Sequence, residues 1–388
     1  MTHYLWGTSL VMFESYLPTP EIRRLVLTLL MGFALVYSIM PHVIAIAVSK
    51  GLVARAVARS SHKGVTPLVG GIPLFLGVIF TTLLLTPPGG WSNLQYILGA
   101  LVIVFMVGTK DDVEQLSPRS KMVGLLIAIA IVVIRGGVQL ECMYGLLGFT
   151  GPFPLVLSWV VSAFTLLVIT NALNLIDGIN GLAGSVGCIA MVTFGVWFFL
   201  VGIPHYSILA LATAGGLLAF LHFNITPART FMGDTGSLFV GLLSGILTIE
   251  FIDLNYFGDV APAYAFNQPV AVAVAVLIIP LFDTIRVFVT RVLRGYSPFK
   301  PDRRHIHHLL IDTGYSHLAA TSVLALFNLS LLSIVMALDA WLGLHWLIGL
   351  QLAVCLLLVY PLHRRAVRAR NAAAAAAATP APALPQGA

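Results

Sequence analysis

Residues 154–180 read PLVLSWVVSAFTLLVITNALNLIDGIN, an apolar run followed by a cluster of amide and carboxyl side chains. The run itself, residues 154–170, contains no charged residue and is long enough to cross most of the apolar layer of a membrane as a helix. Four polar side chains then follow at intervals of three, a spacing that favours one stripe along a helix: Asn171, Asn174, Asp177 and Asn180. This stretch predicts a membrane helix that carries polar groups to one membrane surface.

Apolar runs of this kind recur along the whole chain. Of its 388 residues, 59% are hydrophobic and only 9% are charged, whereas soluble proteins carry about 25% charged residues. This composition excludes a soluble fold, a disordered chain and a nucleic-acid-binding domain. The runs lie near residues 25–46, 68–86, 93–109, 121–137, 154–170, 183–202, 206–222, 237–252, 269–289, 318–339 and 344–361. We therefore predict an all-α polytopic integral membrane protein with about 11 transmembrane helices.

The positive charges predict the orientation of these helices, because lysine and arginine gather in cytoplasmic loops. If the N-terminus lies outside and the C-terminus in the cytoplasm, only Arg23, Arg24 and Arg135 of the 21 basic residues lie outside. Residues 1–371 then form a single polytopic transmembrane domain. We expect residues 372–388, which are rich in alanine and proline, to be a disordered tail.

In this orientation every unusual polar segment lies on the cytoplasmic side. The adjacent Asp111 and Asp112 end the third run, where the two charges repel each other and the helix dipole disfavours both. Two unfavourable electrostatic effects at one place indicate a metal ion or a role in proton transfer. The alternative is a solvated acidic loop. The segment 171–184 holds Asp177 and three glycines. It indicates a binding site, with close helix packing as the alternative.

Three further segments carry charge on this side. In residues 231–237 (FMGDTGS), Asp234 stands between two glycines at the start of a run. It either caps that helix or holds a metal–phosphate pair. The loop 297–308 (SPFKPDRRHIHH) combines lysine and arginine with three histidines, which predicts an anion-binding surface. The alternatives there are a zinc site or a loop that only sets topology. Lys63 either adds to a phosphate site or belongs to a flexible loop.

Carboxylates and basic groups on one membrane face point to phosphate chemistry. Mg²⁺ binds a few carboxylates together with phosphate oxygens and water, and phosphoryl transfer needs cations that neutralise the transferred group. The sequence has no P-loop, which argues against ATP hydrolysis. Asp283 and Arg286, three residues apart, are expected to pair near the same site. The rival class is a secondary transporter of an anionic solute, but transporters place such charges near the midplane rather than at one face.

Five motifs, in this order, resemble those of the polyprenyl-phosphate N-acetylhexosamine-1-phosphate transferases, most closely the bacterial branch that uses undecaprenyl phosphate and N-acetylglucosamine. They span most of the chain: residues 62–71 (HKGVTPLVGG), 111–112 (DD), 171–178 (NALNLIDG), 231–236 (FMGDTG) and 297–308 (SPFKPDRRHIHH). The resemblance implies transfer of a sugar 1-phosphate from a UDP-sugar to undecaprenyl phosphate, with release of UMP. It also implies that the reaction requires Mg²⁺, for which Mn²⁺ is the expected substitute.

The resemblance further implies roles for single residues. Asp234 is the expected principal Mg²⁺ ligand, with Asp111 and Asp112 as further ligands, and Asp111, Asp112 and Asp177 form the expected catalytic set. The expected substrate-binding residues are Asn171, Asn174, Lys63, Arg303, His305, His307 and His308. Two positions depart from the family pattern, because Gln115 and Asn180 stand where many members have aspartate.

The histidine loop bears on the choice of donor sugar. Leu309 and Leu310 follow the histidines, where the branch that handles a muramoyl-pentapeptide typically has Phe-Glu. The resemblance therefore favours UDP-N-acetylglucosamine, with UDP-N-acetylgalactosamine or a UDP 6-deoxy-amino sugar as the alternative. The implied setting is the bacterial inner membrane, with the site at the cytoplasmic face among membrane lipid. The implied product begins a cell-surface polysaccharide such as O-antigen, and a homodimer is the assembly we consider.

Overall fold

The computed structural model describes residues 20–51, 66–225, 227–297 and 304–378, and within them it contains helices and loops but no strand. The α-helices are α2 (Pro20–Ser49), α3 (Gly71–Leu85), α4 (Leu94–Glu114), α5 (Pro118–Ala130), α6 (Leu155–Ile176), α7 (Leu182–Leu200), α8 (Pro204–Asn224), α9 (Gly233–Phe257), α10 (Pro269–Val276), α11 (Ile278–Leu293), α12 (Ile306–Asp312), α13 (His317–Leu338) and α14 (Leu344–Ala378). Three short segments complete the set: η1 (Pro88–Gly90), the π-helical η2 (Ile131–Arg135) and η3 (Leu146–Gly148).

The helices follow the apolar runs of the sequence. Each predicted run coincides with one helix or with a consecutive pair, α5 with η2 and α10 with α11. Seven of the described helices are long and apolar enough to cross a membrane, and eight segments are if the bent pair counts as one. The protein is therefore an all-α, multi-pass membrane protein, as predicted. The count of about 11 crossings and their direction stay predictions.

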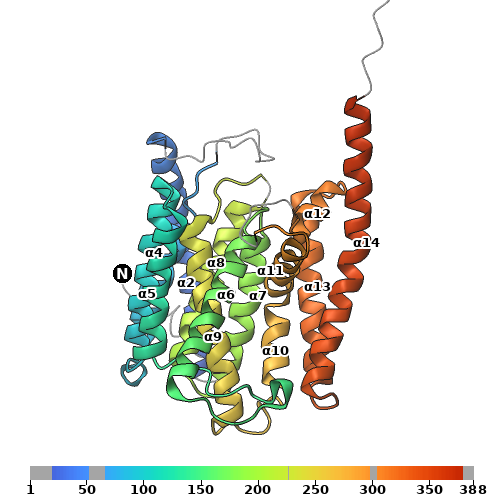
Figure 1. The fold of residues 1–388 in the computed structure, drawn as a ribbon. Coiled ribbons are helices and arrows are strands. Elements are labelled where there is room, and N and C mark those ends of the chain that lie inside the picture. The colour runs from blue at the N-terminus through green and yellow to red at the C-terminus, as the bar shows by residue number, and fades with distance from the viewer. Residues whose placement is uncertain (1–19, 52–65, 226, 298–303, 379–388) are drawn as a thin grey trace, which may run out of the picture.

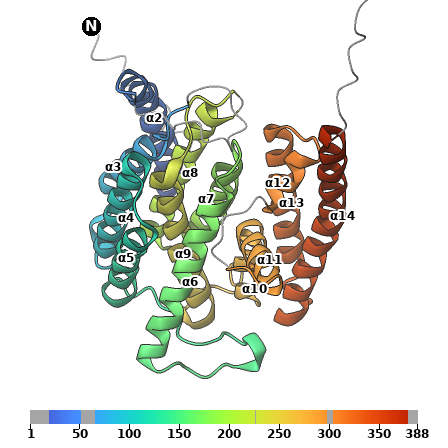
Figure 2. The same ribbon diagram turned by 45° about the horizontal axis from the view of Figure 1, so that its top comes forward.

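The long helices lie side by side, with their axes roughly along one direction (Figures 1 and 2). Among them, α9 is almost wholly buried and packs against α3, α4, α6 and α7. Glycines allow the closest of these contacts. A Cβ atom on Gly108 would come within 2.6 Å of the Cα atom of Thr235, and one on Gly241 within 2.8 Å of the Thr170 carbonyl oxygen. The start of α9 is thereby pressed against the end of α4.

The ninth run is broken rather than straight, which the sequence analysis did not predict. Its two halves, α10 and α11, meet at an angle of 82°. Pro280 has no N–H group to donate to the carbonyl of Val276. The buried amide of Asn328 on α13 donates instead to the carbonyl oxygens of Ala275 (3.0 Å) and Val276 (3.3 Å). Gln351 on α14 donates likewise to Ala271 (3.0 Å). The Asn328 side chain thus satisfies carbonyl groups that the break leaves, and Gln351 adds a contact from α14 to α10.

The last helix extends well beyond the others at one end of the molecule (Figure 1). The sequence analysis placed a disordered tail from residue 372 onward, whereas α14 continues to Ala378. Residues 372–378 are all alanine, which has the highest helix propensity of any residue. The alanine run therefore prolongs the helix, and residues 379–388 lie outside the described part of the chain.

Candidate active site

Four carboxyl groups meet at one end of the bundle, contributed by three helix ends. Asp111 and Asp112 lie in the last turn of α4, Asp177 directly follows α6, and Asp234 lies in the first turn of α9. Because α9 packs against both α4 and α6, these ends are neighbours in space although they are far apart in the sequence. Like charges so close together require nearby cations or hydrogen-bond donors.

Lys121, on the first turns of α5, supplies one such cation. Its Nζ atom lies 2.9 Å from Oδ2 of Asp111 and 2.6 Å from Oδ2 of Asp234. The sequence analysis did not single out this lysine. Lys110, which directly precedes the acidic pair in the sequence, pairs instead with the exposed Glu114 at 3.4 Å. The short connection between α4 and α5 was the available signal, because it forces the start of α5 back toward the end of α4.

Asp112 holds the start of α9. Its Oδ1 accepts a hydrogen bond from the backbone N–H of Asp234 (2.8 Å), and its Oδ2 accepts from the N–H (2.9 Å) and hydroxyl (2.6 Å) of Thr235. A carboxylate at this position satisfies free N–H groups and complements the helix dipole. Gly233 has a φ of 68°, and a Cβ atom there would lie 2.6 Å from Oδ2 of Asp112. Only glycine fits this approach.

This arrangement decides between the two interpretations of Asp234. The helix begins one residue earlier, at Gly233, and Met232 stands at its N-cap without a capping side chain. The interpretation of Asp234 as the cap of α9 is therefore wrong, because Asp112 satisfies the helix start from α4. The Asp234 carboxylate is directed instead toward Lys121 and Asn174.

The amide of Asn174 completes the surroundings of Asp234. Its Nδ2 atom donates to Oδ1 of Asp234 (2.5 Å) and to Oγ of Ser237 (2.8 Å). Asn171, one turn earlier, donates to the carbonyl of Leu167 in its own helix (2.8 Å). The structure thus places Asn174 at the carboxylate cluster, whereas the amide of Asn171 is used within α6.

The predicted stripe of four polar residues on one helix is wrong beyond its first two members. The helix α6 ends at Ile176, so Asp177 and Asn180 lie in the turn that follows it. Gly181 adopts a φ of 80°, which lets the chain reverse there. The carbonyl of Asn180 accepts from the Thr321 hydroxyl on α13 (2.7 Å). The turn after α6 is therefore stabilised by a hydrogen bond from α13, and it does not continue the helix.

Asp177 carries a perturbed carboxyl group. Burial is the main cause, and the negative charges of Asp234 and Asp112 add to it, so that its pKa rises to about 7. A hydrogen bond from the Gly233 backbone opposes part of this rise. The group is consequently close to half-protonated at neutral pH, in a cluster where Lys121 is the one described cation beside three other carboxyl groups.

The histidine segment reaches this turn through the short helix α12. His307 is only 2% exposed, and a Cβ atom on Gly178 would lie 2.4 Å from its Nε2 atom. Neither ring nitrogen has a hydrogen-bond partner among the described residues. Burial lowers the pKa of His307 to about 3, so the ring is neutral. His308 lies beside it, with ring centroids 4.2 Å apart.

His305 lies beside His307, with nearly parallel rings whose centroids are 5.7 Å apart. Its Nδ1 atom lies 2.9 Å from Oδ2 of Asp283 on α11. Asp283 also pairs with Arg286, as predicted (2.7 Å). Lys63 and Arg303 lie outside the described residues.

The carboxylate oxygens suit Mg²⁺ bound together with phosphate and water better than a metal ion held by protein side chains alone. Within the described ranges no group of three or more His, Cys, Asp or Glu side chains is arranged to hold a metal ion, which gives the zinc alternative no support. Asp111 and Asp234 nevertheless turn one oxygen each toward the same positive charge, that of Lys121. Mg²⁺ commonly takes only one or two carboxylates and completes its shell with phosphate oxygens and water. The donor set therefore fits Mg²⁺ bound together with a phosphate.

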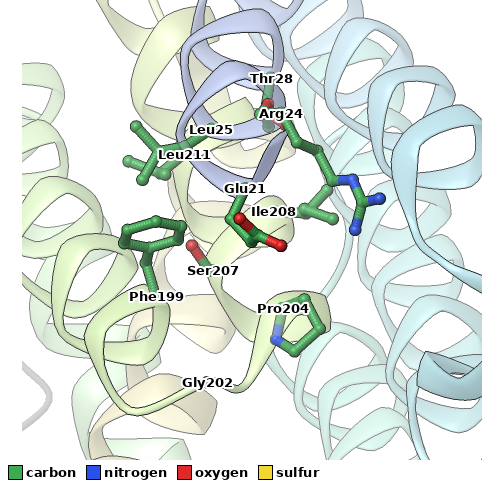
Figure 3. A pocket seen from close by; sticks show the side chains of 10 residues that line it. All are labelled: Glu21, Arg24, Leu25, Thr28, Phe199, Gly202, Pro204, Ser207, Ile208 and Leu211. Atoms are coloured by element: carbon green, nitrogen blue, oxygen red, sulfur yellow. The ribbon is translucent and has the colours of Figure 1, made fainter. Parts of the chain in front are cut away.

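A cavity of about 190 Å³ lies at the other end of the bundle, between the start of α2, the end of α7 and the start of α8 (Figure 3). Mostly apolar side chains line it, with Glu21 and Arg24 among them. It is separate from the carboxylate cluster, because these three helices have their opposite ends at the cluster side.

Comparison with known proteins agrees with the motifs. The model of glycosyl transferase family 4 matches residues 94–252. A protein of Bacillus subtilis (strain 168) named probable undecaprenyl-phosphate N-acetylglucosaminyl 1-phosphate transferase is 32% identical over 317 residues, covering 79% of this chain and 82% of its own. The decaprenyl-phosphate N-acetylglucosaminephosphotransferase of Mycolicibacterium smegmatis is 31% identical over 330 residues (79% and 80%). An undecaprenyl-phosphate alpha-N-acetylglucosaminyl 1-phosphate transferase of Yersinia pestis is 31% identical over 279 residues (70% and 72%). The chain belongs to glycosyl transferase family 4, among the polyprenyl-phosphate N-acetylhexosamine-1-phosphate transferases.

Proposed function

We propose that the protein transfers N-acetylglucosamine 1-phosphate from UDP-N-acetylglucosamine to undecaprenyl phosphate. An oxygen of the lipid phosphate forms a bond to the β-phosphorus of the donor, the bond between that phosphorus and the bridging oxygen breaks, and UMP leaves. The observation that carries the proposal is the carboxylate–lysine cluster at one end of a membrane helix bundle. The names of relatives that cover about four fifths of the chain support the same reaction.

Mg²⁺ is the proposed cofactor, with Mn²⁺ as a substitute. Asp234 and Asp111 would hold it, and when bound it neutralises charge on the transferred phosphoryl group. Asp112 is less available as a ligand, since both of its oxygens accept hydrogen bonds from the start of α9. Its proposed contribution is to fix the Asp234 backbone, and with it the position of the principal carboxylate.

The acceptor needs little help to react. A phosphate monoester has a second pKa near 6 and is mostly dianionic at neutral pH. We therefore propose that Asp111 orients the acceptor rather than serving as an indispensable base. Lys121, already placed between Asp111 and Asp234, offers the one described ammonium group within the cluster to a phosphate oxygen.

The donor is proposed to approach from the side of α12. His307 and His308 lie beside the turn after α6, and the neutral ring of His307 keeps both nitrogens unused among the described residues. UDP-N-acetylgalactosamine and UDP 6-deoxy-amino sugars are the competing donors. We place the reaction at the cytoplasmic face of the bacterial inner membrane, at the first lipid-linked step of a cell-surface polysaccharide such as O-antigen.

The test is release of UMP by the purified protein with undecaprenyl phosphate, Mg²⁺ and a panel of UDP-sugars. We expect release with UDP-N-acetylglucosamine and its loss in Asp234→Ala. Asp259→Ala is the matched control, because Asp259 is exposed and follows the far end of α9. Release with another UDP-amino sugar alone would overturn the donor assignment. Absence of release with every donor, from folded protein, would overturn the transferase and favour transport.

A further inference from the structure

The short helix α12 is fixed at its start by a buried carboxylate. Asp283 on α11 is 1% exposed. Its Oδ1 accepts a hydrogen bond from the backbone N–H of Ile306 (3.0 Å), and its Oδ2 lies 2.9 Å from Nδ1 of His305. Burying a carboxylate is unfavourable unless it is paired and hydrogen-bonded. The two contacts of this group with His305 and Ile306 therefore tie the start of α12 firmly to α11.

Arg286 strengthens the same attachment. Its Nη2 atom donates to Oδ1 of Asp283 (2.7 Å) and to the carbonyl oxygen of Arg304 (2.5 Å), the residue just before the histidine segment. A single guanidinium thus bridges α11 and the chain that enters α12. The intrahelical pair anticipated from the sequence is part of a larger contact that the spacing alone does not reveal.

The end of α12 is fixed from a different helix. Asp312, its last residue, accepts hydrogen bonds at Oδ2 from Nε (2.9 Å) and from Nη2 of Arg370. Arg370 lies on α14, the last helix of the fold. Ile306, Leu309 and Leu310 are buried on the other side of α12. The helix is therefore held at both ends and along its apolar face.

The attachment of α12 is relevant to the candidate active site because α12 carries His307. His307 stands against Gly178, next to the perturbed carboxyl of Asp177. The contact leaves no slack, since a single added carbon on Gly178 would collide with the ring. A small displacement of α12 would move His307 relative to Asp177, and displacements of about 1 Å are enough to lower reaction rates substantially.

We propose that Asp283 and the Asp312–Arg370 pair are positioning residues, which clamp α12 at its two ends and thereby set the place of His307 and the affinity for the nucleotide donor. None of the three contacts substrate in this proposal. The effect of this clamp on donor affinity rests on the proposed function, whereas the existence of the clamp does not. The last helix, α14, then contributes to the site, because its Arg370 carries the far half of the clamp.

Hydrogen exchange of the full-length protein in detergent tests the clamp without reference to activity. In Arg370→Gln, we expect the amides of residues 306–312 to exchange about fivefold faster, as loss of an ion pair worth up to about 1 kcal/mol predicts. Exchange in α4 should not change. Arg368→Gln is the matched control, since Arg368 lies on the same helix, is exposed, and forms no hydrogen bond or ion pair with α12 among the described residues. Equal exchange in the two variants would overturn the proposal.

Kinetics test the consequence for the donor. Arg370→Gln should raise KM for UDP-N-acetylglucosamine about fivefold while kcat and the KM for undecaprenyl phosphate stay within about twofold. The double variant Asp312→Arg with Arg370→Asp restores the pair with reversed charges and should return KM toward the original value. A fall in kcat with unchanged KM, or no rescue, would overturn the positioning role. If no donor reacts even with the unaltered protein, the proposed function fails and the exchange experiment still decides the clamp.

Discussion

Lys121 joins two carboxylates that belong to different helices. Its ammonium group lies 2.9 Å from Asp111 on α4 and 2.6 Å from Asp234 on α9. Asp112, the neighbour of Asp111, reaches the backbone of the same turn of α9. The ends of α4, α5 and α9 are thus connected by charge and by hydrogen bonds, and the carboxylates have a defined geometry before any substrate binds.

Removal of this lysine should affect activity strongly. We expect Lys121→Gln to lower the rate of UMP release about 100-fold, because the variant loses a preorganised positive charge at the reacting phosphates. Lys121→Arg should retain more activity, since it keeps the charge but changes its geometry. Lys110→Gln, which alters only an exposed pair with Glu114, should stay within about twofold of the original rate. Similar losses in the two glutamine variants would contradict this prediction.

Gly233→Ala should destabilise the fold for two separable reasons. The residue has a φ of 68°, and the new methyl group would lie 2.6 Å from the Asp112 carboxylate. Gly202 has a similar φ of 78° but open space around it. We expect Gly202→Ala to cost about 1 kcal/mol of unfolding free energy through backbone strain, and Gly233→Ala to cost about 3 kcal/mol. Denaturant unfolding in detergent measures both, and equal costs would show that the contact with Asp112 is unimportant.

Chelation of divalent metal should abolish activity without unfolding the protein. Lys121 and Asn174 already stabilise the Asp234 carboxylate, so the fold does not depend on a metal ion to separate the acidic groups. With EDTA we therefore expect UMP release to stop, the thermal unfolding midpoint to stay the same, and added Mg²⁺ to restore activity. A clear drop in the midpoint would show instead that the metal is part of the folded structure.

The stability of the protein should depend on pH through His307. The folded state keeps the pKa of this ring at about 3, whereas an unfolded histidine titrates near 6.5. Between these values the unfolded chain binds the extra proton, so unfolding becomes easier as the pH falls. From pH 7 to pH 5 this contributes about 2 kcal/mol of destabilisation.

Comparison of two proteins isolates that contribution. The raised pKa of Asp177 acts in the opposite direction over part of the same range, because a carboxyl that stays protonated in the fold becomes less favourable as the pH rises. His307→Asn removes only the histidine term. Its unfolding free energy should therefore fall less between pH 7 and pH 5 than that of the unaltered protein, and parallel pH profiles would refute the assignment.

Much of the fold could be predicted from the sequence, because apolar runs have only one way to satisfy their backbone inside a membrane. Every predicted run lies on a helix for that reason. The approach of the acidic residues was partly foreseeable, because the predicted topology places their helix ends on one side of the membrane. The break between α10 and α11 was not, because it depends on amides of Asn328 and Gln351 that come from later helices.

The sequence predicted which residues belong to the candidate site better than it predicted which of them contact each other. Asp234 and Asn174 both belong to motifs that the sequence analysis singled out, and the structure brings them into contact. Lys121 belongs to no quoted motif, and its role appears only when α5 is placed against α4. The function of Asp112 in holding α9 likewise requires knowledge of which backbone N–H groups face it. Periodicity within one helix carries no information of this kind, and for Asp177 and Asn180 it led to the wrong placement.

The contact between Asp312 and Arg370 has a consequence for biosynthesis. The two residues are 58 positions apart, and Arg370 is translated after all the other groups described at the site. While the last helix is still being made, the carboxyl groups at the ends of α4, α6 and α9 can already assemble, but the end of α12 still lacks the contact with Arg370. The carboxylate half of the site is therefore synthesised before the half that carries the histidines is fixed at both ends, and the contact from α14 comes last.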